Sequence, residues 1–197
     1  MVVSPESSDE DIIYIEEWAL RIQNIALDIQ ANALKRNLII YFSITSTFQS
    51  VNSKPYMTPL RILESGVIFG VVVFTPSQAI IAGNIMKDVA DEILIDAEKK
   101  NGAQIDINYS LLKNFNIKLS GNQKKSSTKS SITDISSAVR LVMPDQKITE
   151  FKPNDITVDA VWTFLSLKLN KLYGKKIAII GCGNIGFKLA LKLAESG

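Results

Sequence analysis

The chain has 197 residues, of which 46% are hydrophobic and 21% charged, as expected for a soluble globular protein of one or two domains. Its net charge of +2 predicts no nucleic-acid partner, and its longest apolar segment, residues 66–74, is too short to span a membrane. The sequence contains no histidine, which excludes Ser-His-Asp, Cys-His and histidine-ligated zinc chemistry, and we predict no metal site.

The cysteine content and the N-terminal charge predict a cytoplasmic location. The single cysteine, Cys182, cannot form an internal disulfide, which fits a reducing compartment. Residues 1–17 contain six acids and no base, unlike a signal peptide.

Residues 1–153 are predicted to form an α/β domain with a mostly parallel sheet. Apolar residues at helical spacing predict a long amphipathic helix over residues 10–35. A strand is expected at residues 37–44, followed by an irregular polar loop with two prolines over residues 45–59. Residues 66–74 are β-branched and apolar on both faces, which predicts a buried parallel strand.

A helix is expected directly after this buried strand. Thr75 is suited to cap it, Pro76 to occupy its first position, and Gln78 to complete a capping box. The helix is predicted to run to about Ala90 and to be followed by a strand at residues 92–98. Such a strand-helix-strand unit is typical of a parallel sheet.

The pattern is weaker between residues 101 and 151. Residues 120–131 are predicted to be a mobile loop, because their polar composition cannot bury surface. The other elements expected here are a helix near residues 133–142 and short strands near residues 103–107, 116–119 and 147–151.

A connecting helix is predicted at residues 154–174, capped by Asn154 or Asp155 and ended by Gly174. Its sequence divides into two opposite stripes. The apolar stripe, which we expect to face a core, contains Val158, Val161, Trp162, Leu165, Leu169 and Leu172. The polar stripe contains Asp155, Asp159, Thr163, Ser166 and Asn170.

Residues 175–197 contain the pattern G-x-G-x-x-G, between a predicted strand and a predicted helix. Gly181 permits the tight turn, Gly183 lets the backbone approach a diphosphate, and Gly186 lets the helix pack closely. The N–H groups at the helix start then face the phosphates. The predicted cofactor-binding residues are Gly181, Cys182, Gly183, Asn184, Ile185 and Gly186. The alternative to a cofactor site is a glycine turn that binds no ligand. Cys182 is interpreted as a small residue that fills space in the turn.

The glycine pattern is read as the first strand and helix of an incomplete Rossmann domain. A ribose-binding acid is expected about 20 residues after the first glycine, beyond Gly197. We therefore expect the chain to be the N-terminal portion of a longer protein and to bind a cofactor weakly by itself.

The domain order and residues 154–197 resemble two-domain dehydrogenases, such as shikimate, methylene-tetrahydrofolate and amino-acid dehydrogenases and the pyrrolysine-forming enzyme. This resemblance implies NAD or NADP as cofactor and hydride transfer to or from a small polar metabolite in the cleft between domains. The segment ITVDAVWTF resembles the connecting helix of shikimate dehydrogenases, whose Asp pairs with a catalytic lysine; Asp159 stands at that place.

Asp159 and Lys54 are the candidate catalytic residues, and each has an alternative interpretation. Asp159 also fits a solvated residue of the polar stripe, and Lys54, which could bind an acidic substrate or donate a proton, also fits a surface lysine.

Two further functions of the chain remain open. One is an ATP-dependent adenylating enzyme of the ubiquitin-activating type, which begins with a similar glycine turn. The other is a non-catalytic nucleotide-sensing module.

Overall fold

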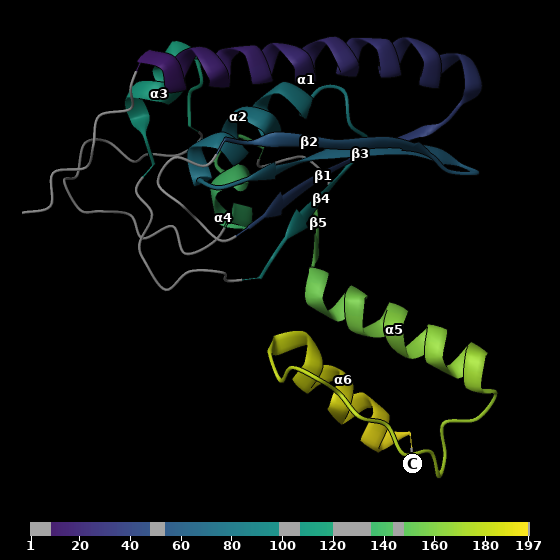
Figure 1. Ribbon diagram of the computed structural model, residues 1–197. Coiled ribbons are helices and arrows are strands. Elements are labelled where there is room, and N and C mark those ends of the chain that lie inside the picture. Colours follow the sequence, from purple (N-terminus) through teal and green to yellow (C-terminus); the bar gives the residue numbers. More distant parts are fainter. Residues whose placement is uncertain (1–8, 48–53, 99–106, 120–134, 144–147, 197) are drawn as a thin grey trace, which may run out of the picture. The chain divides into compact units, whose positions relative to one another are not determined.

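The computed structural model describes residues 9–47, 54–98, 107–119, 135–143 and 148–196. The chain divides into two compact units, Met1–Phe151 (unit 1) and Lys152–Gly197 (unit 2). Figure 1 shows their helices and strands. Of the helices described, none combines the length and the apolar character that a membrane crossing needs.

Unit 1 contains a five-stranded sheet with the strand order β2-β3-β1-β4-β5. Its strands are β1 (Ile39–Ser46), β2 (Tyr56–Ile62), β3 (Gly66–Val73), β4 (Glu92–Asp96) and β5 (Ile148–Phe151). β1 lies parallel to both β3 and β4, and β4 lies parallel to β5, whereas β2 runs antiparallel to β3. The predicted α/β fold with a mostly parallel sheet is therefore confirmed.

Three helices of unit 1 pack side by side against this sheet. α1 (Asp9–Arg36) contacts α2 (Pro76–Met86), and α2 contacts α4 (Ile135–Arg140). α1 and α2 also contact β1 and β3, while α4 contacts β4. A short helix, α3 (Tyr109–Asn114), packs against α2.

The core of unit 1 lies between these helices and one face of the sheet. Phe42 of β1 and Phe69 of β3 are fully buried there, and their ring centroids lie 5.0 Å apart in an edge-to-face arrangement. Side chains alternate between the two faces of a strand, and Tyr41, Ser43 and Leu94 on the other face are only half-buried. The apolar burial that stabilises the unit is thus concentrated on one face.

Local sequence signals position α2 as expected. The Oγ1 atom of Thr75 accepts a hydrogen bond from the backbone N–H of Gln78 (3.2 Å). The Oε1 atom of Gln78 accepts one from the backbone N–H of Phe74 (2.8 Å), which closes a variant of the predicted capping box. The helix ends at Met86, four residues before the expected Ala90.

The expected loop at residues 45–59 is wrong at both ends, because β1 continues to Ser46 and β2 begins at Tyr56. Pro59 lies inside this edge strand, and the pairing of β2 with β3 shifts register between Thr58 and Arg61. Proline lacks the N–H group that a central strand needs, but an edge strand with a bulge accommodates it.

The expected strand at residues 116–119 is also wrong, because α3 is followed by a turn at residues 115–116 and residues 117–119 belong to no strand. The side chain of Asn108 caps α3 by accepting from the N–H of Leu111 (3.0 Å). Asn116 then adopts a positive φ of 54°, and the N–H of Ile117 donates to the carbonyl of Leu112 (3.1 Å). The predicted helix near 133–142 and strand near 147–151 are confirmed as α4 and β5.

Two further expectations of this region lie outside the described residues. They are the strand at residues 103–107, apart from Ile107, and the loop at residues 120–131. Ile107 itself belongs to no strand and lies two residues before α3.

Unit 2 contains two helices, α5 (Pro153–Leu169) and α6 (Asn184–Glu195). The N-cap of α5 is Lys152, without a side-chain hydrogen bond, rather than Asn154 or Asp155. Pro153 takes the first helical position, which its fixed φ favours. The helix ends at Leu169, before the expected end at Gly174, and its C-cap Asn170 adopts a left-handed φ of 63°.

The strand expected at residues 176–180 is not formed in the described part of the chain. A strand requires ladder hydrogen bonds to a neighbouring strand, and all five paired strands belong to unit 1. Residues 175–180 therefore connect α5 to α6 without regular structure, and the helix that was predicted to follow the glycine pattern is present.

Candidate nucleotide-binding site

The glycine turn lies at the start of α6, and two of its three glycines are required by the turn itself. Gly181 has a φ of +97°, a conformation that residues with a side chain rarely adopt. A Cβ atom added to Gly186 would lie 2.1 Å from the carbonyl oxygen of Gly181. Both positions therefore need glycine for internal reasons: the tight turn that the sequence predicts at Gly181, and at Gly186 a close approach to the carbonyl of Gly181 rather than to the predicted strand.

The third glycine, Gly183, has no such internal reason. Its backbone angles, φ −75° and ψ −172°, are open to any residue. A Cβ atom built on it would meet nothing within 4 Å. The backbone of Gly183 is therefore open to a group from outside, which is the role that the middle glycine has in dinucleotide-binding turns.

The first turn of α6 presents backbone donors at the same place. Its N-cap is Gly183, so no side-chain oxygen caps the helix. The helical hydrogen bonds begin with the N–H of Phe187, which donates to the carbonyl of Gly183 (2.9 Å). The N–H groups of Asn184, Ile185 and Gly186 precede this bond, and with the helix dipole they favour an anion.

The side chains of the turn are open to solvent. Cys182 is a free, exposed cysteine between the first two glycines, and Asn184 and Ile185 are also exposed. The six predicted cofactor-binding residues thus form one turn and the beginning of one helix. An exposed thiol at its centre offers a chemical probe of that turn.

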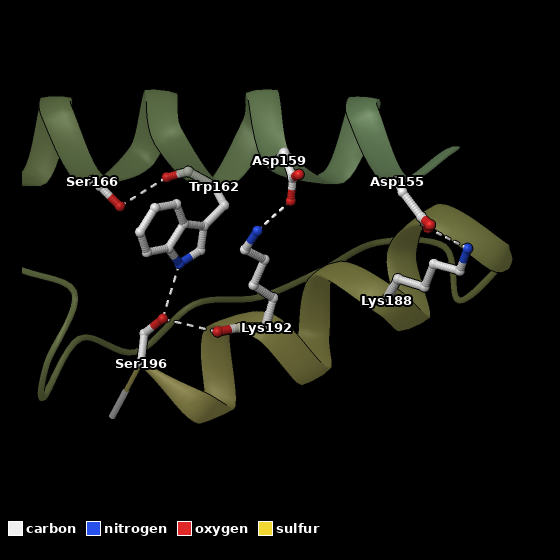
Figure 2. Close-up of polar contacts among 7 residues, drawn as sticks. All are labelled: Asp155, Asp159, Trp162, Ser166, Lys188, Lys192 and Ser196. Atoms are coloured by element: carbon white, nitrogen blue, oxygen red, sulfur yellow. Dashed lines mark hydrogen bonds and ion pairs between the residues drawn. The ribbon is translucent and has the colours of Figure 1, made fainter. Parts of the chain in front are cut away.

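Three side-chain pairs join α5 to α6 (Figure 2). Lys188 Nζ donates to Asp155 Oδ1 at 2.5 Å, and Lys192 pairs with Asp159. Trp162 Nε1 donates to Ser196 Oγ at 2.9 Å. The partners are 33, 33 and 34 residues apart in the sequence, and this nearly constant offset means that the helices run parallel.

These pairs correct the expected orientation of α5. The polar stripe was expected to lie opposite the packed side, but Asp155 and Asp159 contact α6, together with Trp162 of the apolar stripe. Within the apolar stripe only Val158 is buried, at 5% exposure. The expectation failed because the facing side of α6 presents lysines and a serine, which select acidic and hydrogen-bonding partners.

The charges around Asp155 stabilise its ionised form. The hydrogen bond from Lys188 lowers the pKa of Asp155 below the ordinary value of 3.8. Desolvation acts in the opposite direction, and the positive charges of Lys188 and Lys152 lower this pKa further. Asp155 is therefore an anion at neutral pH, in the first turn of α5.

The two candidate catalytic residues belong to different units. Lys54 precedes β2 in unit 1, and its Nζ lies 4.7 Å from the ring centroid of Tyr14. The hydroxyl of Tyr14 donates to the carbonyl of Pro55 (3.2 Å), so this segment is held against α1. Asp159 belongs to unit 2, where its lysine partner is Lys192.

A buried acid at the end of β4 was not among the predicted residues. Asp96 is 1% exposed, and its Oδ2 accepts from both the N–H and the hydroxyl of Ser46 (3.1 Å each). Its Oδ1 accepts from the N–H of Glu98 (2.9 Å). The sequence signal was an acid that ends an apolar strand.

Among the described residues, no group of three or more Cys, Asp or Glu side chains is arranged to hold a metal ion.

Comparison with protein families, with curated proteins and with solved structures finds no match for this chain.

Proposed function

We propose that the chain binds the diphosphate of a nicotinamide dinucleotide, NAD or NADP, at the turn of residues 181–186, and that it serves an oxidoreductase. The observation that supports this most strongly is Gly183, which neither its backbone angles nor its surroundings require to be glycine. A main chain that must approach phosphate oxygens supplies the missing reason.

In this proposal the turn binds and orients, and the cofactor supplies hydride chemistry. The N–H groups that precede the first helical bond of α6 donate to phosphate oxygens, and the helix dipole favours the negative charge. The proposed substrate is a small polar metabolite. Lys54 is proposed to bind an acidic substrate or to donate a proton, whereas Asp159 is occupied by Lys192 and is given no part in proton transfer. A cytoplasmic location is proposed because the single cysteine fits a reducing compartment.

The thiol of Cys182 tests this proposal, since it is the only cysteine and lies between two glycines of the turn. We expect millimolar NAD or NADP, and inorganic pyrophosphate, to slow its reaction with a thiol reagent. Nicotinamide riboside, which lacks the diphosphate, serves as the comparison and should leave the rate unchanged.

The variant Gly183→Ala separates binding from folding. Its added methyl group meets nothing in the folded chain, so the helical circular dichroism should be retained, yet the methyl group obstructs the phosphates and protection should be lost. Glu195→Gln, at the far end of α6, is the control and should keep the protection. Protection that survives in Gly183→Ala contradicts binding at this backbone.

The same assay discriminates the competing functions. Protection by ATP with no response to either dinucleotide favours an adenylating enzyme and defeats the oxidoreductase proposal. If neither dinucleotides, ATP nor pyrophosphate protect the thiol, the turn is a glycine turn that binds no nucleotide.

A further inference from the structure

The parallel arrangement of α5 and α6 brings their N-terminal ends to the same end of unit 2. The Asp155–Lys188 pair lies at this end, and the Trp162–Ser196 pair lies at the other (Figure 2). Each helix N-terminus carries the positive end of a helix dipole. The glycine turn therefore lies where two such ends are close together.

Basic side chains add to the positive potential at this end of unit 2. Lys188 is four residues after Asn184, the first residue of α6, and helical side chains tilt toward the helix N-terminus. Its ammonium group binds the carboxylate of Asp155, in the first turn of α5 at this same end of unit 2. Lys152, the N-cap of α5, is near enough to act on the charge of Asp155.

Asp155 is the anion within this positive surrounding, and its contact with Lys188 is partly open to solvent. The side chains of Lys188 and Asp155 are 34% and 49% exposed, and ion pairs as exposed as this one contribute little to the free energy of folding. A bound diphosphate would carry more charge than this carboxylate and would also accept hydrogen bonds from the N–H groups of α6.

We propose that Asp155 acts as an internal competitor for the nucleotide: it holds Lys188 while the turn is empty and yields Lys188 to the diphosphate when the turn is occupied. This inference depends on the proposed nucleotide binding. It also gives the turn a selectivity, because every ligand that takes Lys188 must first break the same Asp155–Lys188 pair, and a singly charged anion gains less from Lys188 than a diphosphate gains. The favoured ligands are therefore diphosphates.

Asp159 provides a matched control, because it makes the same kind of ion pair with Lys192 one helical turn farther from the glycine turn. Concentrations of NAD, NADP and pyrophosphate that give half-protection of Cys182 are compared in the full chain. We expect Asp155→Asn to lower these concentrations about two- to fivefold, the range of exposed ion pairs, and Asp159→Asn to leave them unchanged.

Substitutions of the two lysines test the same inference independently of the substitutions of the two acids. Lys188→Gln should raise the half-protection concentration about two- to fivefold, whereas Lys192→Gln should not change it. Because each variant removes one helix-helix pair, any effect of loosened packing appears in both members of a comparison.

The outcomes distinguish this inference from the proposal on which it depends. If the unmodified chain is protected but Asp155→Asn and Asp159→Asn behave alike, the competitor role is wrong and nucleotide binding stands. A stronger response of Asp155→Asn to acetate than to pyrophosphate also contradicts the proposed selectivity. If neither the unmodified chain nor Asp155→Asn is protected by any of the three ligands, both proposals fall.

Discussion

Units 1 and 2 differ in what holds their helices in place. In unit 1, α1 and α2 bury apolar side chains such as Ile22 and Ile80 in a continuous core with the sheet. In unit 2, α5 and α6 are joined by two ion pairs and a hydrogen bond from Trp162. Buried apolar area supplies most of the free energy of folding, and exposed ion pairs supply little. Unit 1 is therefore expected to be the more stable of the two.

The two tryptophans of the chain allow this difference to be measured unit by unit. Trp18 is buried in unit 1, and Trp162 contacts Ser196 and Lys192 in unit 2. The variants Trp162→Phe and Trp18→Phe each leave one fluorescent reporter. Denaturant unfolding of the two variants should give separate transitions, with that of unit 2 at the lower denaturant concentration.

The largest effect is expected from truncating the centre of the unit 1 core. Phe42→Ala removes a fully buried ring that packs on Phe69, and we expect the free energy of unfolding of unit 1 to fall by about 3–5 kcal/mol. Urea unfolding followed through Trp18 measures this loss. The matched truncation Phe164→Ala in unit 2, where the ring is 58% exposed, should cost less than about 0.5 kcal/mol. Equal losses would contradict the contrast between the units.

An intermediate effect is expected at the carboxyl end of β4. Asp96→Asn should destabilise unit 1 by about 1–3 kcal/mol, because an amide offers one acceptor oxygen where the carboxylate uses both. Glu92→Gln on the same strand, at an exposed hydrogen bond to Thr149, is the control and should cost less than about 0.5 kcal/mol. Urea unfolding reported by Trp18 gives both values, and an unchanged midpoint for Asp96→Asn would show that this carboxylate is not needed.

The sequence predicts unit 1 well where a single physical signal dominates. Ile15, Ala19, Ile22 and Ala26 recur at helical spacing and are buried as one stripe of α1. Thr75 carries the signal of a helix start in its own side chain. Such signals are local, so they need no knowledge of what the segment meets in the folded chain.

The failures occur where the outcome depends on a distant partner. β2 is an edge strand whose pairing with β3 outweighs the local effect of Pro59, and a propensity argument does not include this pairing. The orientation of α5 depends on Lys188 and Lys192 of α6. The sequence does contain a signal for this orientation, because the two acids of α5 and the two lysines of α6 have the same four-residue spacing. The match is found only when the sequences of the two helices are compared with each other.

The glycine turn lies between these two groups, since part of it is predicted from local sequence and part depends on another molecule. The roles of Gly181 and Gly186 follow from the spacing and appear in the backbone geometry. The proposed role of Gly183 concerns a molecule outside the chain, and the protection of Cys182 in Gly183→Ala measures it directly.

The smallest effect is expected from acid, and it tests the polar contacts of unit 2 directly. Because the pKa of Asp155 is lowered in the folded chain, its pair with Lys188 contributes stability that is complete above the ordinary value of 3.8. This contribution is lost only as the pH falls below 3.8, through the lowered pKa. A carboxyl ¹³C titration of Asp155 should therefore show a midpoint below 3.8, and Lys188→Gln should move it upward. A midpoint at or above the ordinary value would mean that Lys188 does not hold this carboxylate in solution, and the Asp159–Lys192 and Trp162–Ser196 contacts would then hold α5 beside α6 without it.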